Sequence, residues 1–386
     1  MGKLKFTAAL FLLVVLLSAT ALTACGKKEY EEITFGFISC ITGPTAWLHP
    51  LWADTAQMAV DEINATGGVD GVPLKMVFGD HQSGDAKAAV TAYHMLRDIH
   101  HVEFIINTFS PPNLAVQPLA AEDKVLTINP SGWSPELVGK DYLFNSRLVG
   151  NILGVGAAKV AWDKGHRKAA ILYPNDKSGI GMTEHVETIW KQWGGTVVVK
   201  ETAEPGANDF KVQLTKIKTA NPEVIMDWFY STDLGCSIKQ ARELRMEQPF
   251  VGLIWHRTIQ EAAGDASEGF SYVEDLWNAK SDDPWTRRFV EAYRATHGGE
   301  NPIMYGANAY DLVYILRDLI LWAKENKGGE YYKGENLREA LTTIKTFPSV
   351  YGGTMTFQDN GTCTKKMAHY VVHAGKAEFV GEVTLD

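Results

Sequence analysis

Two glycine pairs are the first candidates for chemistry, because glycine-rich turns can hold a phosphate against backbone N–H groups. Gly154-Val-Gly156 and Gly179-Ile-Gly181 both begin like a dinucleotide-binding motif, but the third glycine positions hold Lys159 and Glu184. The first pair lies inside a helical pattern, and we interpret the second as a close backbone turn that opens a helix. The chain also has no GxxxxGKS/T, HExxH or GxSxG motif, so the motifs predict no nucleotide site and no enzyme.

A histidine pair and three cysteines are the next candidates, as metal ligands. His100 and His101 are adjacent and so do not share a helix face, and no third ligand is near in the sequence, which favours a solvated helix end. Cys40, Cys236 and Cys363 are too far apart for a zinc or CxxC pattern. A disulfide between two of them is possible, but buried free thiols are favoured. We predict no metal and no cofactor.

Cys25 has a different setting from the other cysteines. Two lysines precede an apolar run from Ala8 to Leu17, and Leu22-Thr23-Ala24 stands directly before the cysteine. This order is typical of a secretory signal peptide, and the apolar run is well short of the ~20 residues of a spanning helix. The junction resembles the bacterial lipoprotein box, in which the cysteine thiol becomes lipidated. We therefore expect a lipoprotein signal peptide over residues 1–25 and a lipid anchor on Cys25.

Length and charge limit the partners. The chain has 386 residues, more than one hydrophobic core usually serves, which indicates two domains. Its formal net charge is −9, and loss of residues 1–25, with two lysines and no acids, lowers the charge to −11. A surface this acidic repels nucleic acid and anionic lipid head groups. Residues 26–32 are charged and aperiodic, so we interpret them as a short tether.

Strands and helices alternate through the rest of the chain. The predicted strands are 33–38, 74–78, 103–106, 125–128, 169–172, 196–200 and 224–228. The predicted helices are 54–64, 86–98, 152–162, 182–193, 210–219, 284–297 and 310–325. Alternation of this kind predicts βαβ units and parallel sheets. The series restarts near residues 147–150, which predicts two similar α/β lobes, and the last hundred residues should return to these two.

A set of short segments follows the order found in one protein family. The segments are Phe35–Pro44, Ala59–Val69, Asn129–Leu137, Ile171–Gly181, Asp209-Phe210, Ala263–Gly269 and Asn308–Val313. Together they resemble the branched-chain amino acid-binding proteins, which are substrate-binding subunits of ABC importers. The resemblance implies two Rossmann-like lobes with central parallel sheets, joined by three crossover strands, as in type I periplasmic binding proteins. It implies residues 33–147 and 280–350 for lobe 1 and residues 148–279 and 351–386 for lobe 2.

The resemblance also places a ligand site on loops at the carboxyl ends of the strands, where open α/β sheets bind ligands. The family serine that holds a ligand carboxylate, together with nearby backbone N–H groups, corresponds to Ser110. Other corresponding positions are the loop Ser131-Gly132-Trp133, where tryptophan replaces the usual Ser or Thr, and the first-loop residues Trp47 and Leu48, where an aromatic is common. In lobe 2 the family has two aromatics, which correspond to Ser178 and Tyr230.

One departure from the family pattern bears on the ligand. The acid that neutralises an α-ammonium should lie near Leu253–Trp255, and the segment Gly252–Arg257 contains no acid. An ammonium buried without a carboxylate costs several kcal/mol, which argues against a plain amino acid. The site instead collects aromatic and basic residues: Phe109, Trp47, Trp133, Trp228, Tyr230, Trp255, His256 and Arg257. Tryptophans at strand ends are also often core packing, and Trp228 is the weakest candidate.

These observations predict an exported, monomeric solute receptor of an ABC importer, acting by hinge closure and held near a membrane permease by its lipid. Tryptophan walls fit an aromatic or apolar carboxylate, with Ser110 or Arg257 on the acid group. They also fit a quaternary ammonium through cation–π attraction. An amino acid, a betaine or an amide as ligand, and a sensor that serves a signalling receptor, remain as alternatives.

Overall fold

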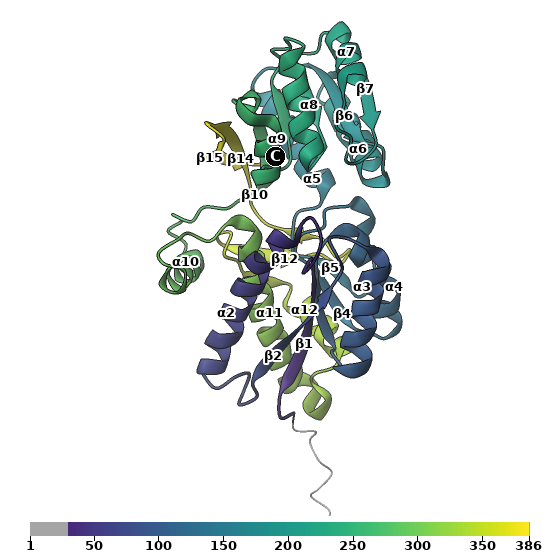
Figure 1. The fold of residues 1–386 in the computed structure, drawn as a ribbon. Helices are drawn as coiled ribbons and strands as arrows, with labels where there is room; N and C mark the ends of the chain where they lie inside the picture. The colour runs from purple at the N-terminus through teal and green to yellow at the C-terminus, as the bar shows by residue number, and fades with distance from the viewer. Residues whose placement is uncertain (1–29, 386) are drawn as a thin grey trace, which may run out of the picture.

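The computed structural model describes residues 30–385, which form two α/β lobes stacked end to end (Figure 1). The predicted signal peptide, Cys25 and most of the tether lie outside the described residues. Within residues 30–385, no helix combines the length and the apolar character that crossing a membrane requires.

Lobe 1 is built on a five-stranded parallel sheet in the order β2-β1-β3-β4-β5. Its strands are β1 (Ile33–Ser39), β2 (Leu74–Asp80), β3 (Phe104–Asn107), β4 (Leu126–Asn129) and β5 (Leu143–Asn145). One face packs against α2 (His49–Ala65), α11 (Met304–Lys327) and α12 (Gly334–Ile344). The other face packs against α3 (Ala86–His94) and α4 (Ser110–Glu122). Both faces are therefore buried, which explains the continuous apolar runs in the strands.

Lobe 2 is built on a seven-stranded sheet in the order β15-β14-β10-β9-β8-β6-β7. Its strands are β6 (Lys168–Pro174), β7 (Thr196–Ala203), β8 (Val224–Asp227), β9 (Phe250–Gly252), β10 (Ser271–Asp275), β14 (Met367–His373) and β15 (Lys376–Val383). Strands β6 to β10 are parallel, and β14 and β15 add an antiparallel edge. Helices α5 (Gly150–Asp163) and α6 (Lys177–Gln192) cover one face, and α7 (Lys211–Ala220), α8 (Thr232–Glu243) and α9 (Arg257–Ala263) cover the other. The predicted parallel α/β architecture is confirmed.

The chain passes between the lobes three times, at residues 146–149, at 276–283 before α10 (Pro284–Thr296), and at 365–366. We call these three segments the hinge. The third passage comes later than predicted. A small sheet of β11 (Thr346–Pro348), β12 (Thr354–Phe357) and β13 (Cys363–Thr364) precedes it. Met355, Phe357 and Cys363 of this sheet are buried in the core of lobe 1, so lobe 1 extends beyond residue 350.

The glycine pairs serve packing. Gly154 and Gly156 lie inside α5, as predicted, where a Cβ would come within 2.8 Å of Val186 and 2.7 Å of Met367. A Cβ on Gly179 would lie 2.2 Å from the carbonyl oxygen of Pro174. The prediction of a close backbone turn at the start of α6 is confirmed.

The cysteines and the histidine pair also have structural settings. Cys40 and Cys363 are buried free thiols, and Cys236 is a half-buried one. His100 and His101 are exposed in the turn before β3. No group of three or more His, Cys, Asp or Glu side chains within residues 30–385 is arranged to hold a metal ion.

Candidate ligand site between the lobes

The amino end of α4 carries the serine that the family resemblance singled out. Phe109, the residue before the helix, has a left-handed φ of 65°, and Ser110 is the first helical residue. Pro111 and Pro112 follow and carry no N–H group. The Ser110 N–H has no acceptor among the described residues, whereas its Oγ accepts a hydrogen bond from the Ser134 N–H at 3.2 Å. This helix end thus offers one backbone donor.

The loop after β4, residues 131–133, lies against the same helix end. The Asn129 side chain holds the loop, because its Oδ1 accepts from the N–H groups of Ser131 (3.1 Å) and Gly132 (2.6 Å). Ser131 Oγ in turn accepts from the Phe109 N–H at 2.9 Å. The Trp133 N–H has no acceptor within residues 30–385. Two backbone donors, those of Ser110 and Trp133, therefore remain available on adjoining segments.

Gly132 is needed for this arrangement. A Cβ at this position would lie 2.9 Å from the Ser110 nitrogen and 3.0 Å from the Phe109 carbonyl carbon. Both neighbours are backbone atoms, which cannot turn aside as a side chain would. The close approach of the two loops therefore depends on the absence of a side chain here.

Aromatic pairs connect the lobes next to these donors. The rings of Trp133 and Tyr230 are 5.8 Å apart at an interplanar angle of 75°, and those of Trp47 and His256 are 5.9 Å apart. Trp47 lies on the short helical turn Ala46–Leu48, and Leu48 packs against the core of lobe 1. Of the predicted site residues, Trp47, Trp133 and Tyr230 thus meet or face a partner across the lobes.

Polar contacts join the lobes at the same side. Ser178 Oγ donates to Ser134 Oγ at 2.9 Å, and Lys177 pairs with Glu136 at 3.2 Å. Burial raises the pKa of Tyr230 to about 12, which keeps its phenol protonated at neutral pH. Burial also lowers the pKa of His256, so its imidazole is neutral there. The predicted residue Ser178 is therefore an interlobe contact.

Phe109 forms an aromatic wall with residues that sequence reasoning missed. Its ring lies 6.1 Å from that of Trp52 and 5.0 Å from that of His81. His81 is fully buried, with Nδ1 accepting from the Gly84 N–H at 3.0 Å and Nε2 lying 2.7 Å from Thr108 Oγ1. Burial lowers its pKa to about 4. The wall beside Ser110 is thus neutral and apolar.

The structure places two predicted site residues elsewhere, which corrects the sequence interpretation. Trp255 is buried in the core of lobe 2, where its ring lies 5.6 Å from that of Phe270 and its Nε1 donates to the Gly375 carbonyl at 3.3 Å. Arg257 is 84% exposed and pairs with Glu261 one helical turn along α9, at 2.7 Å. Burial in the core stabilises the large apolar indole of Trp255 more than a solvent-facing position would. The Arg257 guanidinium stays at the surface, where Glu261 lies one helical turn away and pairs with it.

Trp228, the weakest candidate of the sequence analysis, is a core residue. Trp228 is 1% exposed and belongs to the core of lobe 2. Asp176 and Asp233, the acids that act on the pKa of Tyr230, both accept hydrogen bonds from the backbone. Asp233 accepts from three backbone N–H groups, and Asp176 accepts from that of Gly179 at 2.7 Å. Asp233 is buried and both of its oxygens are engaged by the backbone, whereas Asp176 accepts through Oδ1.

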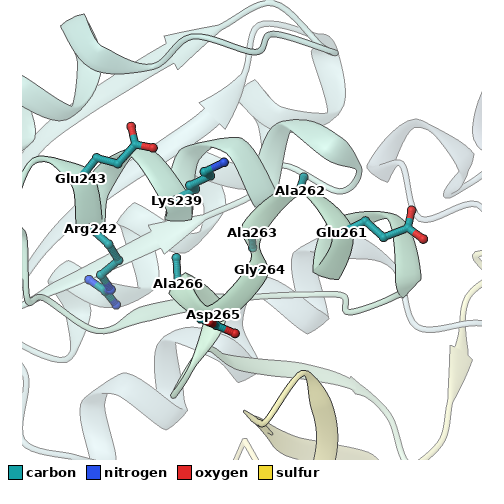
Figure 2. Close-up of a pocket in the computed structure, with 9 residues that line it drawn as sticks. All are labelled: Lys239, Arg242, Glu243, Glu261, Ala262, Ala263, Gly264, Asp265 and Ala266. Atoms are coloured by element: carbon teal, nitrogen blue, oxygen red, sulfur yellow. The ribbon is translucent and has the colours of Figure 1, made fainter.

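Two surface hollows lie on lobe 2. Figure 2 shows the first, of about 440 Å³, which is lined by Lys239 and Arg242 of α8 and by Glu261 of α9, among others. The second, of about 540 Å³, is lined by Arg257, Gln260 and Gly375 among others. Apart from Arg257, none of the predicted site residues lines either hollow. The candidate site is instead the junction between the lobes.

The periplasmic binding protein model matches residues 32–377, which is most of the chain and spans both lobes and the hinge. This chain belongs to the periplasmic binding protein family. Its curated relatives include a leucine-, isoleucine-, valine-, threonine- and alanine-binding protein of Pseudomonas aeruginosa. That periplasmic binding protein is 27% identical over 351 residues, which cover 88% of this chain and 91% of the relative.

Solved structures of the family have the same architecture. The branched-chain amino acid transporter substrate-binding protein LivJ of Streptococcus pneumoniae, in complex with isoleucine, has a TM-score of 0.78 at 25% identity and covers 91% of this chain and 99% of its own. An ABC transporter solute-binding protein from R. palustris, in complex with benzoate, has a TM-score of 0.74 at 18% identity, with 91% and 96% covered. The predicted type I periplasmic binding fold is confirmed, and these relatives are solute-binding proteins.

Proposed function

We propose that this periplasmic binding protein is the solute receptor of an ABC importer and binds a small carboxylate between its lobes. The observation that carries the proposal is the pair of N–H donors of Ser110 and Trp133, neither of which has an acceptor in the part of the chain that the structure describes. A carboxylate has two oxygens and is well matched to two backbone donors and a serine hydroxyl. The relatives named above bind amino acids or benzoate, and each of these ligands carries a carboxylate.

The proposed mechanism is hinge closure. The carboxylate binds first to Ser110 and the 131–133 loop of lobe 1, and Tyr230 and Ser178 of lobe 2 then complete the site. The ligand stabilises the closed form because it contacts both lobes only there. A membrane permease is the proposed recipient of the closed receptor, which acts as a monomer.

The remainder of the ligand is proposed to be aromatic or apolar. Phe109, Trp47, Trp133 and Tyr230 supply flat apolar surface next to the carboxylate donors. An α-ammonium would need a carboxylate, and the segment Gly252–Arg257 contains none, while the buried Asp233 already accepts from three backbone N–H groups. This distribution supports an aryl or alkyl carboxylate over a plain amino acid, with a betaine or an amide as the alternative.

Lipid attachment at Cys25 is proposed from the sequence alone. It would hold the receptor on the outer side of the cytoplasmic membrane, close to the permease. Only residues 26–32 would separate the lipid from β1, which restricts the receptor to the vicinity of the membrane.

A thermal-shift screen with aromatic acids, short-chain acids, amides, betaines and amino acids tests the ligand class. A ligand at about 100 times its dissociation constant stabilises the fold by about 2.7 kcal/mol. We expect the largest shifts from benzoate-like acids. Shifts from leucine or valine, with none from aromatic acids or betaines, would contradict the argument from the missing acid.

The variant Ser110→Ala tests the carboxylate site itself. Loss of a hydrogen bond to a charged group costs about 1.5–3 kcal/mol, so carboxylate affinity should fall at least about tenfold in titration calorimetry. Thr188→Ala is the control, because that hydroxyl bonds the Glu184 carbonyl of its own helix at 2.8 Å. Equal affinity in both variants would show that the site lies elsewhere.

A further inference from the structure

We propose that Arg147 is a positioning residue that fixes the 131–133 loop to the hinge, so that lobe rotation and the ligand-facing N–H of Trp133 are mechanically linked. The link to ligand binding rests on the proposed function, whereas the attachment of the loop to the hinge does not. Arg147 lies in the first passage between the lobes and is 5% exposed.

The guanidinium contacts the 131–133 loop at two points. Arg147 Nη1 donates to the Ser131 carbonyl oxygen at 3.2 Å. Its central carbon lies 5.2 Å from the centroid of the Trp133 ring, within cation–π range. The backbone of the loop and its one large side chain are therefore held by the same group.

The other arm of the guanidinium reaches the second passage of the hinge. Arg147 Nη2 forms a buried ion pair with Glu274 on β10, the strand that leads into residues 276–283. The two side chains are 6% and 2% exposed. A planar guanidinium can bond two partners in fixed directions, which a lysine ammonium does not reproduce.

A second buried ion pair at the hinge provides a contrast. Lys365, in the third passage, pairs with Asp275 at 2.7 Å, with exposed fractions of 1% and 2%. Lys365 lies over the ring of Tyr351 at 3.9 Å, and Asp275 accepts from the Leu148 N–H at 3.3 Å. The contacts described for this pair include none with residues 131–133. The pair thus joins hinge segments without reaching the ligand donors.

The consequence is a connection between closure and the donor pair. When the first and second passages change their dihedral angles, Arg147 moves with them and pulls on Ser131 and Trp133. Asn129 holds the base of the loop within lobe 1, so the strain falls on Trp133. Arg147 acts on the ligand through this loop and is not itself a ligand contact.

The test measures amide hydrogen exchange at Ser131 and Gly132 in the full chain without added solute. Arg147→Lys keeps the charge but loses the two-armed geometry. The double variant Arg147→Met/Glu274→Leu removes both charges, a replacement that often leaves stability unchanged. The double variant Lys365→Met/Asp275→Asn is the matched control. Exchange should accelerate at least about tenfold in both Arg147 variants and stay at the parent rate in the control.

Either of two results would overturn the attachment: parent-like exchange in Arg147→Lys, or equal acceleration in the control. If the Arg147→Met double variant does not fold, Arg147→Lys decides alone. The second readout is affinity for benzoate and for L-leucine, which should fall at least about tenfold for any probe that the parent binds. Unchanged affinity beside a faster loop would refute the positioning role. If the parent binds neither probe, the carboxylate proposal loses its support, and the exchange result still decides on Arg147.

Discussion

The rings of Trp133 and Tyr230 meet edge to face at 5.8 Å, although one belongs to lobe 1 and the other to lobe 2. The ring of the same tryptophan also lies against the Arg147 guanidinium, and its backbone N–H is a proposed ligand donor. The proposed ligand contact therefore uses the main chain of Trp133, whereas the lobe contact uses its side chain. Substitution can separate these two roles, because only the side chain changes.

Trp133→Ala should favour the open form. An aromatic pair contributes about 0.5–1.5 kcal/mol beyond its buried area, and this contribution is lost between the lobes. Small-angle X-ray scattering without added solute should show a larger radius of gyration than in the parent. Trp255→Phe is the control, since the ring contact and the hydrogen bond described for Trp255 both lie within lobe 2, and it should leave the radius unchanged. A parent-like radius in Trp133→Ala would mean that the ring pair does not hold the lobes.

Gly132→Ala should weaken both the fold and the site. The added methyl would meet the Ser110 nitrogen at 2.9 Å, and overpacking of this kind costs about 1–3 kcal/mol. Urea unfolding should report that loss, and carboxylate affinity should fall because the Ser110 donor is displaced. Gly181→Ala in α6 meets no atom within 4 Å and should be neutral or stabilising by up to about 1 kcal/mol. Equal stability of the two variants would contradict the close loop contact.

His81 should make stability depend on pH in the acid range. Burial lowers its pKa from 6.5 to about 4 in the folded chain, so the unfolded chain binds its proton first as the pH falls. The contribution is fully present above pH 6.5 and is lost between pH 6.5 and pH 4, up to about 3 kcal/mol. His81→Asn removes this group, and Asn can still accept from the Gly84 N–H.

The comparison is made by chemical denaturation of parent and His81→Asn from pH 7 to pH 4. Asp227 and Asp311 have pKa values raised to about 7 by burial and titrate in both proteins, so the difference between the two curves isolates His81. That difference should shrink as the pH falls. A constant difference would refute the neutral buried imidazole.

Arg257→Ala should leave ligand affinity unchanged. The side chain is exposed and pairs with Glu261 on its own helix, and exposed pairs of this kind contribute little because water screens them. Calorimetric titration with the best compound of the screen is the measurement. A loss of affinity greater than about threefold would mean that Arg257 takes part in ligand binding.

The sequence predicted the fold better than the side-chain directions. Alternating apolar runs and helical stripes were enough for two parallel α/β lobes, because that pattern directly reflects burial. Trp255 and Arg257 stand three and five residues after β9 ends, where a ligand contact is plausible from position alone. The direction of Trp255 depends on Gly375, which is 120 residues away in the chain. Local pattern does not contain that information.

The Arg147–Glu274 pair was missed for the same reason. The two residues are 127 positions apart in the chain. They meet because the first and second passages of the hinge are adjacent in the fold. A signal was nevertheless present. Arg147 is the one charged residue in the run 142–150 at the division between the lobes, and Glu274 and Asp275 end the otherwise uncharged strand β10. Charged residues at buried positions seldom occur without a partner.

Pro111 and Pro112 also affect which anions the receptor accepts. Helix amino ends commonly bind phosphate with several successive N–H groups, and the two prolines remove those donors from α4. A tetrahedral oxyanion would leave much of its charge unsatisfied at this helix, whereas a planar acid needs only the donors that remain. Inorganic phosphate and sulfate would therefore compete poorly with an organic acid.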